Sequence, residues 1–280
     1  DWHRGGFGGA PKFPPSMVLE FLMRHGARTG SERALLMVDG TCEAMARGGM
    51  YDQLAGGFAR YSVDAGWVVP HFEKMLYDNA QLLRVYLHLW RATQSPLAER
   101  ISRQTADFIL RDLGTADGGF ASALDADADG VEGLTYAWNP QQLVEVLGED
   151  DGLRAALLLE VTEPGTFEDG LSTLQMRAEP VDAQWWEGAR ARLQAARDLR
   201  PQPARDDKVV TSWNGLAIAA LSEAGVLLEG AGYLEAAATC AQCPVSSHLV
   251  DGRLHRASRA GPGGRARGEA DGAGDAAAGA

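Results

Sequence analysis

The densest chemistry in the sequence lies in one run, H-F-E-K-M-L-Y-D-N, which starts at His71. If the run is helical, Glu73 and Tyr77 lie four residues apart on one face, and Lys74 and Asp78 form an i,i+4 ion pair on the adjacent face. An imidazole and a carboxylate that lie close together can exchange a proton with a substrate. The structural alternative is a capping histidine with surface ion pairs. The sequence leaves both interpretations open.

A second cluster is acidic, D-A-D-A-D-G, and begins at Asp125. It imitates the start of a calcium-binding loop, D-x-D-x-D-G. The twelfth position of such a loop should be a bidentate Glu, but here it is Tyr136, so neither an EF-hand nor another bound metal is expected. Asp125 and Asp127 then either line a ligand cleft or belong to a solvated turn. Asp125 is the best single candidate because it lies nearest to the preceding Gly-Gly-Phe loop.

Aromatic residues lie beside polar ones at two further places in the sequence. An indole beside an amide and a carboxylate suits a sugar, because the apolar face of the sugar ring stacks on it while the hydroxyls form hydrogen bonds. The structural alternative at each place is a helix N-terminus or a loop with a buried tryptophan. The candidates for ligand contact here are Arg60, Tyr61, Trp67, Asp207, Trp213 and Asn214.

Composition and charge limit the class of protein and its partners. The 280 residues include 45% hydrophobic and 23% charged residues, which is typical of a soluble globular protein. The 26 Lys and Arg residues against 38 Asp and Glu give a formal charge of −12. Nucleic acid and anionic membranes are therefore not expected as partners.

The 3 cysteines cannot form a disulfide framework, which favours a reducing compartment and a cytoplasmic location. Cys240 and Cys243 have the spacing of a redox pair, but they lie at the end of a helical stretch with no strand before them. Such a context does not depress a thiol pKa. We expect no redox function from this pair and no cofactor.

The elements that must position these residues are helices. Apolar residues recur every three or four positions, and caps mark helix starts at Ser16, Ser31 and Asn139-Pro140. We predict helices over residues 16–25, 31–47, 72–93 and 97–112, a short helix from Pro140 that ends at Gly148, and weaker ones near 150–160, 183–198, 212–229 and 232–241. Strand alternation is almost absent. The predicted fold class is all-α with long Gly-rich loops.

Two of these loops repeat the sequence Gly-Gly-Phe-Ala, from Gly56 and from Gly118, and Gly5–Gly9 is a looser third copy. The first two copies each follow a helix and have an acid about five residues further on. Helix pairs joined by Gly-rich loops at a spacing of roughly 50 to 70 residues indicate an array of α-hairpins. Double glycines allow a sharp turn at a helix end, and they also let a ligand approach closely.

Five long runs carry a resemblance to a known family: G-G-F-G-G-A-P-K-F-P from Gly5, Y-D-Q-L-A-G-G-F-A-R-Y-S-V-D from Tyr51, W-V-V-P-H-F-E-K-M-L-Y-D-N-A from Trp67, D-G-G-F-A-S-A-L-D-A-D from Asp117 and D-D-K-V-V-T-S-W-N-G-L from Asp206. In this order they resemble the spermatogenesis-associated, thioredoxin-domain-containing family of bacteria and animals. The resemblance implies a thioredoxin-like domain followed by a six-hairpin (α/α)6 toroid, similar to those of N-acylglucosamine 2-epimerases and many glycosidases.

The match to this family pattern is incomplete. The thioredoxin-like domain would precede Asp1, and the eight or nine expected helices compare with the twelve of a closed toroid. Residues 257–280 have no Ile, Leu, Val, Met or aromatic residue and cannot bury a core. We therefore expect an incomplete (α/α)6 toroid over residues 1–254 and a disordered or frameshifted Gly/Ala/Arg-rich tail over residues 255–280.

Alternate loops of such a toroid gather at one end of the barrel. The resemblance therefore implies that His71, Glu73 and Asp125 line one cleft as catalytic groups, with Trp67 and Trp213 near its rim. The other expected ligand-binding residues are Arg60, Tyr61, Lys74, Tyr77, Asp78, Asp127, Asp207 and Asn214.

Two classes of function fit this arrangement. A sugar epimerase or isomerase needs two proton-transfer groups on opposite faces of a carbon, and a hydrolase needs two carboxylates about 5 to 10 Å apart, such as Glu73 and Asp125. The other class is a non-catalytic toroid, which binds a sugar-like ligand or a partner and serves the thioredoxin-like domain of the same parent chain.

Overall fold

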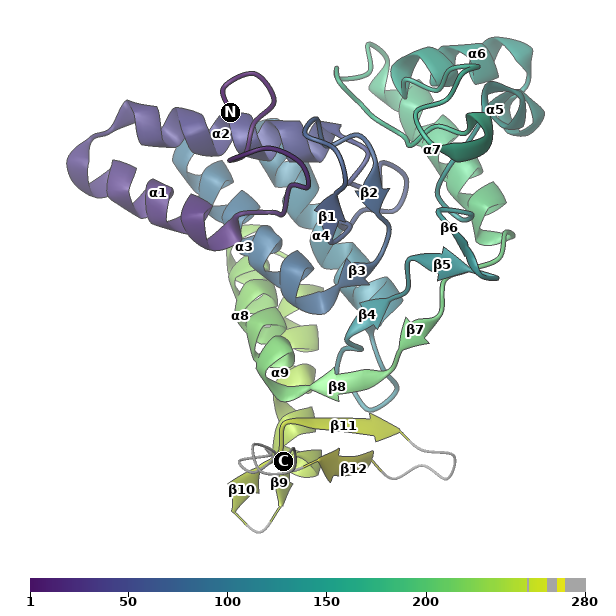
Figure 1. Ribbon diagram of the computed structural model, residues 1–280. Coiled ribbons are helices and arrows are strands. Elements are labelled where there is room, and N and C mark those ends of the chain that lie inside the picture. Colours follow the sequence, from purple (N-terminus) through teal and green to yellow (C-terminus); the bar gives the residue numbers. More distant parts are fainter. Residues whose placement is uncertain (251, 261–265, 270–280) are drawn as a thin grey trace, which may run out of the picture.

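The computed structural model describes residues 1–250, 252–260 and 266–269, and helices dominate it (Figure 1). The helices are α1 (Ser16–Thr29), α2 (Glu32–Arg47), α3 (Leu76–Thr93), α4 (Pro96–Leu113), α5 (Pro140–Leu147), α6 (Glu149–Leu158), α7 (Ala183–Asp198), α8 (Thr211–Leu227) and α9 (Ala231–Ser247), with a 3₁₀ turn at Glu168–Gly170. The strands are β1 (Tyr61–Ser62), β2 (Pro70–His71), β3 (Lys74–Met75), β4 (Ala123–Leu124), β5 (Asp127–Ala128), β6 (Val131–Glu132), β7 (Arg205–Asp206), β8 (Lys208–Val210), β9 (Leu249–Val250), β10 (Arg253–Leu254), β11 (Ala257–Ala260) and β12 (Ala266–Glu269).

Two of the three helix starts have the caps that the sequence predicts. The third is wrong, because Ser16 is the first residue of α1 and Pro15 stands at the cap position with no side-chain hydrogen bond. The Ser31 side chain accepts a hydrogen bond from the Ala34 N–H, and Asn139 forms a capping box with Gln142 ahead of Pro140. Each of these caps satisfies N–H groups that a helix start leaves without a partner. The all-α fold class is confirmed.

One predicted helix start is wrong, because residues 72–75 are extended. Lys74 and Met75 pair antiparallel with Leu124 and Ala123, and the Leu76 N–H donates to Ser122 O at 2.9 Å. Pairing with a distant strand thus overrides the local apolar spacing, and α3 begins only at Leu76. The expected shared helix face of Glu73 and Tyr77 and the expected i,i+4 pair of Lys74 and Asp78 are therefore wrong.

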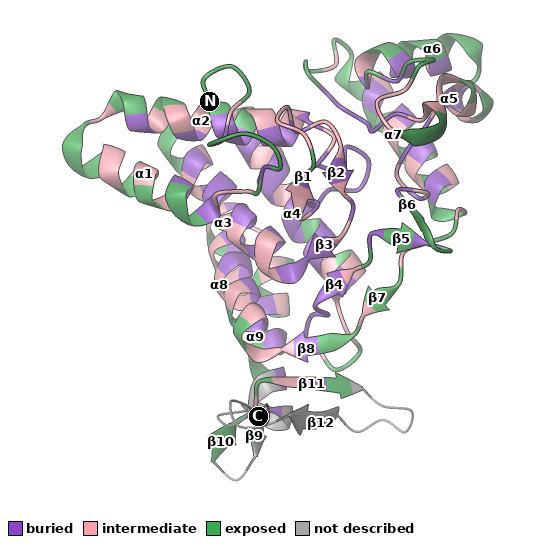
Figure 2. Cartoon of the chain, viewed as in Figure 1, coloured by how far each residue is buried: buried purple, intermediate pink, exposed green. Residues whose placement is uncertain are grey.

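Three helical hairpins form the body: α1 with α2, α3 with α4, and α8 with α9. Helix α3 packs against both α1 and α8, so these three form an inner layer. One buried core, which includes Met45 and Tyr86, joins α1 to α4, and a second, which includes Phe108 and Leu221, joins α3, α4, α8 and α9 (Figure 2). Hairpins with one inner and one outer helix are the unit of the (α/α)6 toroid, and the described residues form part of one.

The Gly-Gly-Phe-Ala repeats lead toward the inner helices, and a buried asparagine ties each repeat to the next inner helix. In the first turn of α3, Asn79 Oδ1 accepts from the Phe58 N–H at 2.7 Å, and Nδ2 donates to Phe58 O and to the carbonyl four residues earlier. Asn214 in the first turn of α8 makes the same three hydrogen bonds, with Phe120 in place of Phe58. Both asparagines are 0% exposed. The repeat is therefore an anchoring device, and we call each set of contacts an Asn clamp.

Helices α5, α6 and α7 form a separate lobe, at the upper right of Figure 1. The lobe has an apolar core, which includes Trp138, Leu143 and Leu193 and is completed by Leu54 of the body. The chain leaves the body after β4 and returns to it at β7, and these two strands pair antiparallel. The lobe is therefore an excursion from one point of the body.

The described C-terminal residues contain strands. Strand β11 pairs with β8 on one side and with β12 on the other. The expected tail over residues 255–280 is thus interrupted by Ala257–Ala260 and Ala266–Glu269. Residues 261–265 and 270–280 lie outside the described residues, and for them the tail stays a prediction.

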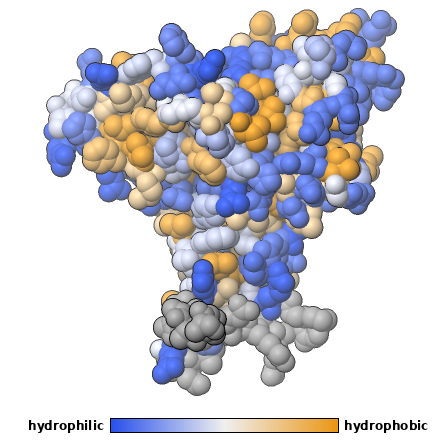
Figure 3. Space-filling model, in the orientation of Figure 1, coloured by the Kyte–Doolittle hydropathy of each residue, from blue (hydrophilic) through white to orange (hydrophobic). Residues whose placement is uncertain are grey.

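Helix α1 leaves apolar side chains exposed at the surface of the body. Met17 is 72% exposed and Phe21 is 60% exposed, and apolar residues are visible on this face of the molecule (Figure 3). None of the described helices is long and apolar enough to cross a lipid bilayer.

Candidate functional site

His71 lies on strand β2 rather than at a helix start. Tyr61 is its partner across the strand pair, and the Tyr61 ring stacks on the imidazole with 5.1 Å between centroids. Phe13 in turn stacks on Tyr61 at 4.7 Å. This row of rings holds the plane of the imidazole, so the two ring nitrogens of His71 point at fixed partners.

The partners of the two nitrogens are glutamates. Nδ1 of His71 lies 2.7 Å from Oε1 of Glu132, and Nε2 lies 3.8 Å from Oε2 of Glu73. Arg60 donates from Nη1 to Glu73 Oε2 at 2.9 Å. The imidazole therefore sits between two carboxylates, one of which is bound to an arginine.

Asp78, in the first turn of α3, is a carboxyl with unusual ionisation beside this group. Burial raises the pKa of Asp78 to about 7, against the opposing effect of Arg60, and the neighbouring Glu73 raises it further. Its Oδ2 atom is buried and has no hydrogen-bond partner in the described part of the chain. A carboxyl with a pKa near 7 is present in both protonation states at neutral pH, so it can donate or accept a proton.

Two aromatic side chains complete the cluster. Tyr77 is next to Asp78, and its ring meets the edge of Trp213, from the first turn of α8, with 4.8 Å between centroids. Burial raises the pKa of Tyr77, which also interacts with Arg60. We call His71, Glu73, Asp78, Arg60, Tyr61, Tyr77, Trp213 and Glu132 the His71 cluster.

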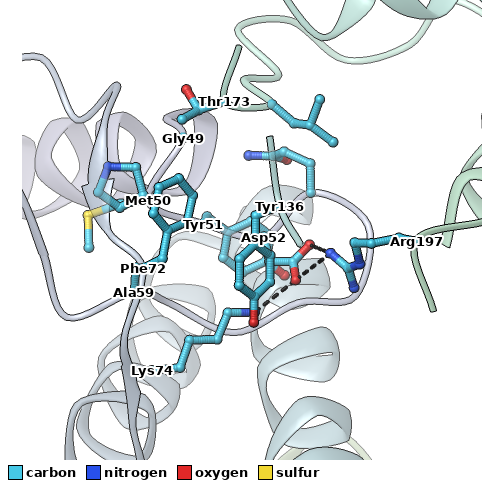
Figure 4. A pocket seen from close by; sticks show the side chains of 13 residues that line it. Gly49, Met50, Tyr51, Asp52, Ala59, Phe72, Lys74, Tyr136, Thr173 and Arg197 are labelled. Atoms are coloured by element: carbon cyan, nitrogen blue, oxygen red, sulfur yellow. Dashed lines mark hydrogen bonds and ion pairs between the residues drawn. The ribbon is translucent and has the colours of Figure 1, made fainter. Parts of the chain in front are cut away.

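Lys74 points away from this cluster into the protein. Its ammonium donates to Asp52 Oδ2 at 2.8 Å, and Asp52 also accepts from Arg197 Nη1 at 2.7 and 2.8 Å (Figure 4). The three side chains are 5%, 5% and 7% exposed, respectively. Burial alone raises the pKa of Asp52, but Arg197 and Lys74 outweigh it and hold that pKa well below its usual range. This buried triad joins α7 of the lobe to the body.

A small cavity adjoins the triad, lined by Tyr136 among others, with a volume of about 30 Å³. That is room for a water molecule and not for a sugar. The place of Lys74 is therefore structural, and the expected contact of Lys74 with a ligand is not supported by its position.

The acids at positions 125, 127 and 207 lie outside the cluster. Asp125 and Asp127 are exposed, and Asp125 Oδ1 accepts from the Ala126 N–H at 2.7 Å. Asp207 is exposed and accepts from Arg205 Nε at 2.6 Å. Asp125 forms no hydrogen bond or ion pair with His71 or Glu73 within the described residues, and a common cleft for these three residues stays a prediction.

The D-A-D-A-D-G run forms the β5–β6 hairpin instead of a calcium loop. Asp129 and Gly130 have φ angles of 51° and 77°, as a two-residue type I′ turn requires. Across the residues that the structure describes, no three His, Cys, Asp or Glu side chains gather in a way that could hold a metal ion.

Trp67 and Asn214 are buried instead of lying at a rim. Trp67 is 0% exposed, its indole N–H donates to Arg4 O at 2.9 Å, and the Lys12 ammonium lies 5.6 Å from the centre of its ring. Asn214 is fully used in its Asn clamp. Neither can touch a ligand without a change of structure, so the rim position expected for Trp67 is wrong.

Cys240 and Cys243 are both buried on α9. Burial raises the pKa of the Cys240 thiol to about 12, and its sulfur lies 3.2 Å from Asn214 Oδ1. A thiol with so high a pKa is a poor nucleophile. This position favours packing over redox chemistry.

Three residues that matter here were missed by the sequence analysis. Glu132 had a signal, because the Asp129-Gly130 turn predicts a hairpin that brings Glu132 back opposite Asp127. Asp52 and Arg197 had none, because they are 145 residues apart in sequence and no local pattern marks a buried ion pair.

The comparisons with known proteins agree with the resemblance seen in the sequence. No protein-family model matches the chain. The chain is 33% identical to spermatogenesis-associated protein 20 of Rattus norvegicus, over 94% of this chain and 39% of that protein. The two are homologous. The chain spans about two-fifths of the length of this relative.

Two solved structures show the distant likeness of the fold. One is a sugar epimerase from a ruminal bacterium, 17% identical with a TM-score of 0.41, covering 92% of this chain and 70% of that chain. The other is a glycoside hydrolase family 76 mannosidase from Bacteroides thetaiotaomicron, which is 10% identical with a TM-score of 0.46. This match covers 83% of this chain and 43% of that chain. At such identities and TM-scores, neither structure bears on the chemistry of the His71 cluster.

Proposed function

We propose that the His71 cluster is a carbohydrate site with acid–base chemistry, of the kind that a sugar epimerase, isomerase or glycosidase needs. Asp78, Glu73 and His71 are the proton-transfer groups of this proposal. Arg60, Tyr61, Tyr77 and Trp213 are the residues that hold the sugar.

The single observation that carries the proposal is a buried Asp78 oxygen without a partner in the described residues, beside the ion pair of Arg60 and Glu73; burial there raises the pKa of Asp78 to about 7. A carboxyl that titrates near neutral pH can act as a general acid or base, and Glu73, bound to Arg60, is a second carboxyl beside it. Structural aspartates are usually ionised and fully hydrogen-bonded, whereas Asp78 keeps a buried oxygen without a partner in the described residues.

The aromatic side chains support a sugar over a more polar ligand. Trp213 and Tyr61 are each half-buried, and they flank the polar groups of the cluster. Apolar ring faces next to hydrogen-bonding groups match the two kinds of surface that a pyranose presents. The negative formal charge of the chain also favours a neutral ligand over a polyanionic one.

The test is a screen of neutral mono- and disaccharides by thermal shift and calorimetry, on the wild-type chain and on two matched variants. Asp78→Asn removes the titrating carboxyl at nearly constant size, and Asp125→Asn makes the same change at an exposed acid outside the cluster. We expect Asp78→Asn to weaken binding or turnover about tenfold or more, and Asp125→Asn to leave both unchanged. Equal behaviour of the two variants, or no sugar bound by the wild type, would overturn the proposal.

Two assays separate the possible reactions on any sugar that binds. An epimerase or isomerase exchanges a substrate hydrogen with deuterium from the solvent, which proton NMR detects. A glycosidase releases new reducing ends. In either case the rate should follow a group with a pKa near 7 that Asp78→Asn removes. Binding without turnover favours the alternative class, a non-catalytic toroid that serves the thioredoxin-like domain of the parent protein.

A further inference from the structure

We infer that Glu132 is a positioning residue for His71, which fixes the hydrogen of the imidazole on Nδ1 and leaves Nε2 as the proton acceptor. The inference deepens the proposed function and rests on it for its catalytic meaning. Its structural core, a fixed tautomer of His71, stands without any ligand.

The contact between the two side chains decides the tautomer. Nδ1 of His71 lies 2.7 Å from Glu132 Oε1, a short hydrogen bond. A carboxylate can only accept, so Nδ1 must carry the hydrogen. A neutral imidazole carries a hydrogen on only one of its two nitrogens, so Nε2 keeps its lone pair free to accept a proton.

Glu132 is itself held in place by the backbone beside His71. The Phe72 N–H also donates to Glu132 Oε1, at 3.4 Å. Gly133, the next residue, has a φ of 73°, and a side-chain carbon added there would lie 2.7 Å from the Phe72 ring. The β5–β6 hairpin can thus come this close to β2 only because position 133 is glycine.

The other nitrogen, Nε2, forms no hydrogen bond with the described residues. Nε2 lies 3.8 Å from Glu73 Oε2, which is too long for a hydrogen bond. The His71 side chain is 29% exposed, so the imidazole is partly open to solvent, and Nε2 is its nitrogen without a hydrogen bond. When a substrate C–H or O–H proton moves to Nε2, its electron pair stays on the substrate, and the imidazolium then lies between two carboxylates.

Glu132 and His71 come from different parts of the structure. Strands β5 and β6 belong to the excursion that begins after β4, whereas His71 and Glu73 belong to the body. The acid–base group of the body is therefore completed by a side chain from the lobe segment of the chain. Displacement of the hairpin would remove the Glu132 hydrogen bond from His71 and leave the imidazole held by its stacking on Tyr61 alone.

The test is ¹⁵N NMR of the histidine side chains on the ligand-free chain, with His71→Gln to assign the His71 signals. In the wild type at a pH where His71 is neutral, we expect shifts of an imidazole that carries its hydrogen on Nδ1. Glu132→Ala should abolish this preference. Glu132→Gln should retain it, because the amide oxygen can still accept from Nδ1. Glu163→Ala, which removes an exposed acid in the lobe segment, is the matched control and should change nothing.

A wild-type His71 with its hydrogen on Nε2, or a tautomer that Glu132→Ala leaves unchanged, would overturn the inference. The wild-type spectrum alone shows which nitrogen of His71 carries the hydrogen, so the inference can be refuted even if a variant fails to fold. The NMR result is independent of any sugar, so failure of the proposed function is recognised separately. If a sugar is turned over, Glu132→Ala should lower kcat about tenfold or more with little change in KM, and Glu132→Gln should restore part of it.

Discussion

The buried triad of Asp52, Lys74 and Arg197 allows a sharp prediction about stability. Asp52→Asn removes the negative charge but keeps the size of the side chain. Two cations, each less than a tenth exposed, then face an amide that offers one acceptor oxygen where the carboxylate used both. The variant therefore leaves buried charge without compensation.

The size of the effect follows from the burial. Removing one partner of a buried ion pair typically costs about 3–5 kcal/mol, because the other charge stays desolvated. We expect a loss of about that size in the free energy of unfolding at pH 7. Since α7 is joined to the body through Arg197, the amide hydrogens of α7 should also exchange faster with solvent.

The pH dependence gives a second check. The pKa of Asp52 is lowered in the folded protein, so the stabilisation by its charge is fully present above the ordinary aspartate pKa of about 4 and is lost as the pH falls below it. The difference between wild type and Asp52→Asn should therefore be constant from about pH 5 to 8 and should narrow below about pH 4.

The assay is urea denaturation followed by far-UV circular dichroism. Glu187→Gln is the control, since Glu187 forms an exposed i,i+3 pair with Arg190 and is 65% exposed. Exposed pairs contribute about 1 kcal/mol or less. If Asp52→Asn costs no more than Glu187→Gln, the triad does not hold the lobe to the body and the reasoning is refuted.

Three further predictions concern the body of the fold. Asn79→Ala leaves both backbone groups of Phe58 without the partners described above, so the free energy of unfolding measured in urea should fall by about 2–4 kcal/mol. A fall of less than about 1 kcal/mol would contradict the Asn clamp. Gly57→Ala should lower the free energy of unfolding by about 2 kcal/mol or more, because φ is +82° and the new carbon would lie 2.6 Å from the Phe108 ring. Gly188→Ala in α7, where the new carbon meets open space, is the control and should raise the free energy of unfolding by about 0.5–1 kcal/mol. His88→Gln should lower the melting temperature more at about pH 5.5 than at about pH 9. Hydrogen bonding to Glu20 raises the pKa of His88, so the stabilisation by its charge is complete below the unfolded pKa of about 6.5 and is lost as the pH rises through the folded pKa. A loss of melting temperature that does not depend on pH would contradict this.

Local signals in the sequence were enough to place the helices. Ser31 and Asn139-Pro140 mark helix starts because the capping side chains act on N–H groups within the same turn. The double-glycine repeats predicted hairpins for a similar reason. What the sequence could not show is the use of the repeats, since Asn214 lies 94 residues from the Phe120 that it anchors.

The errors at the site share one physical cause, which is pairing over long distances in the chain. The run from His71 to Asn79 looks helical, but its first residues pair with β1 and β4, and this turns His71 toward Glu132 and Lys74 toward Asp52. A tryptophan in a loop gives the same local signal whether it is exposed or, like Trp67, fully enclosed. Sequence alone found most residues of the cluster but could not say which of them face one another.

The pairing of β4 with β7 makes the lobe a removable module in the topological sense. Ala123 lies opposite Asp206 and Leu124 opposite Arg205, so the two ends of the excursion are already neighbours and a short linker can join them. The body then keeps all three hairpins and both Asn clamps. It loses the contacts that the lobe segment makes with it, among them the ion pair of Arg197, the hydrogen bond of Glu132 and the hydrogen bond from Thr173 to Val68 O. Because the entropy of closing a loop rises only slowly with its length, insertion of a whole lobe at this point adds little to the entropic cost of folding the body. The same geometry means that the body and the lobe segment, although the chain enters and leaves the lobe at one point, share one group of proposed proton-transfer residues.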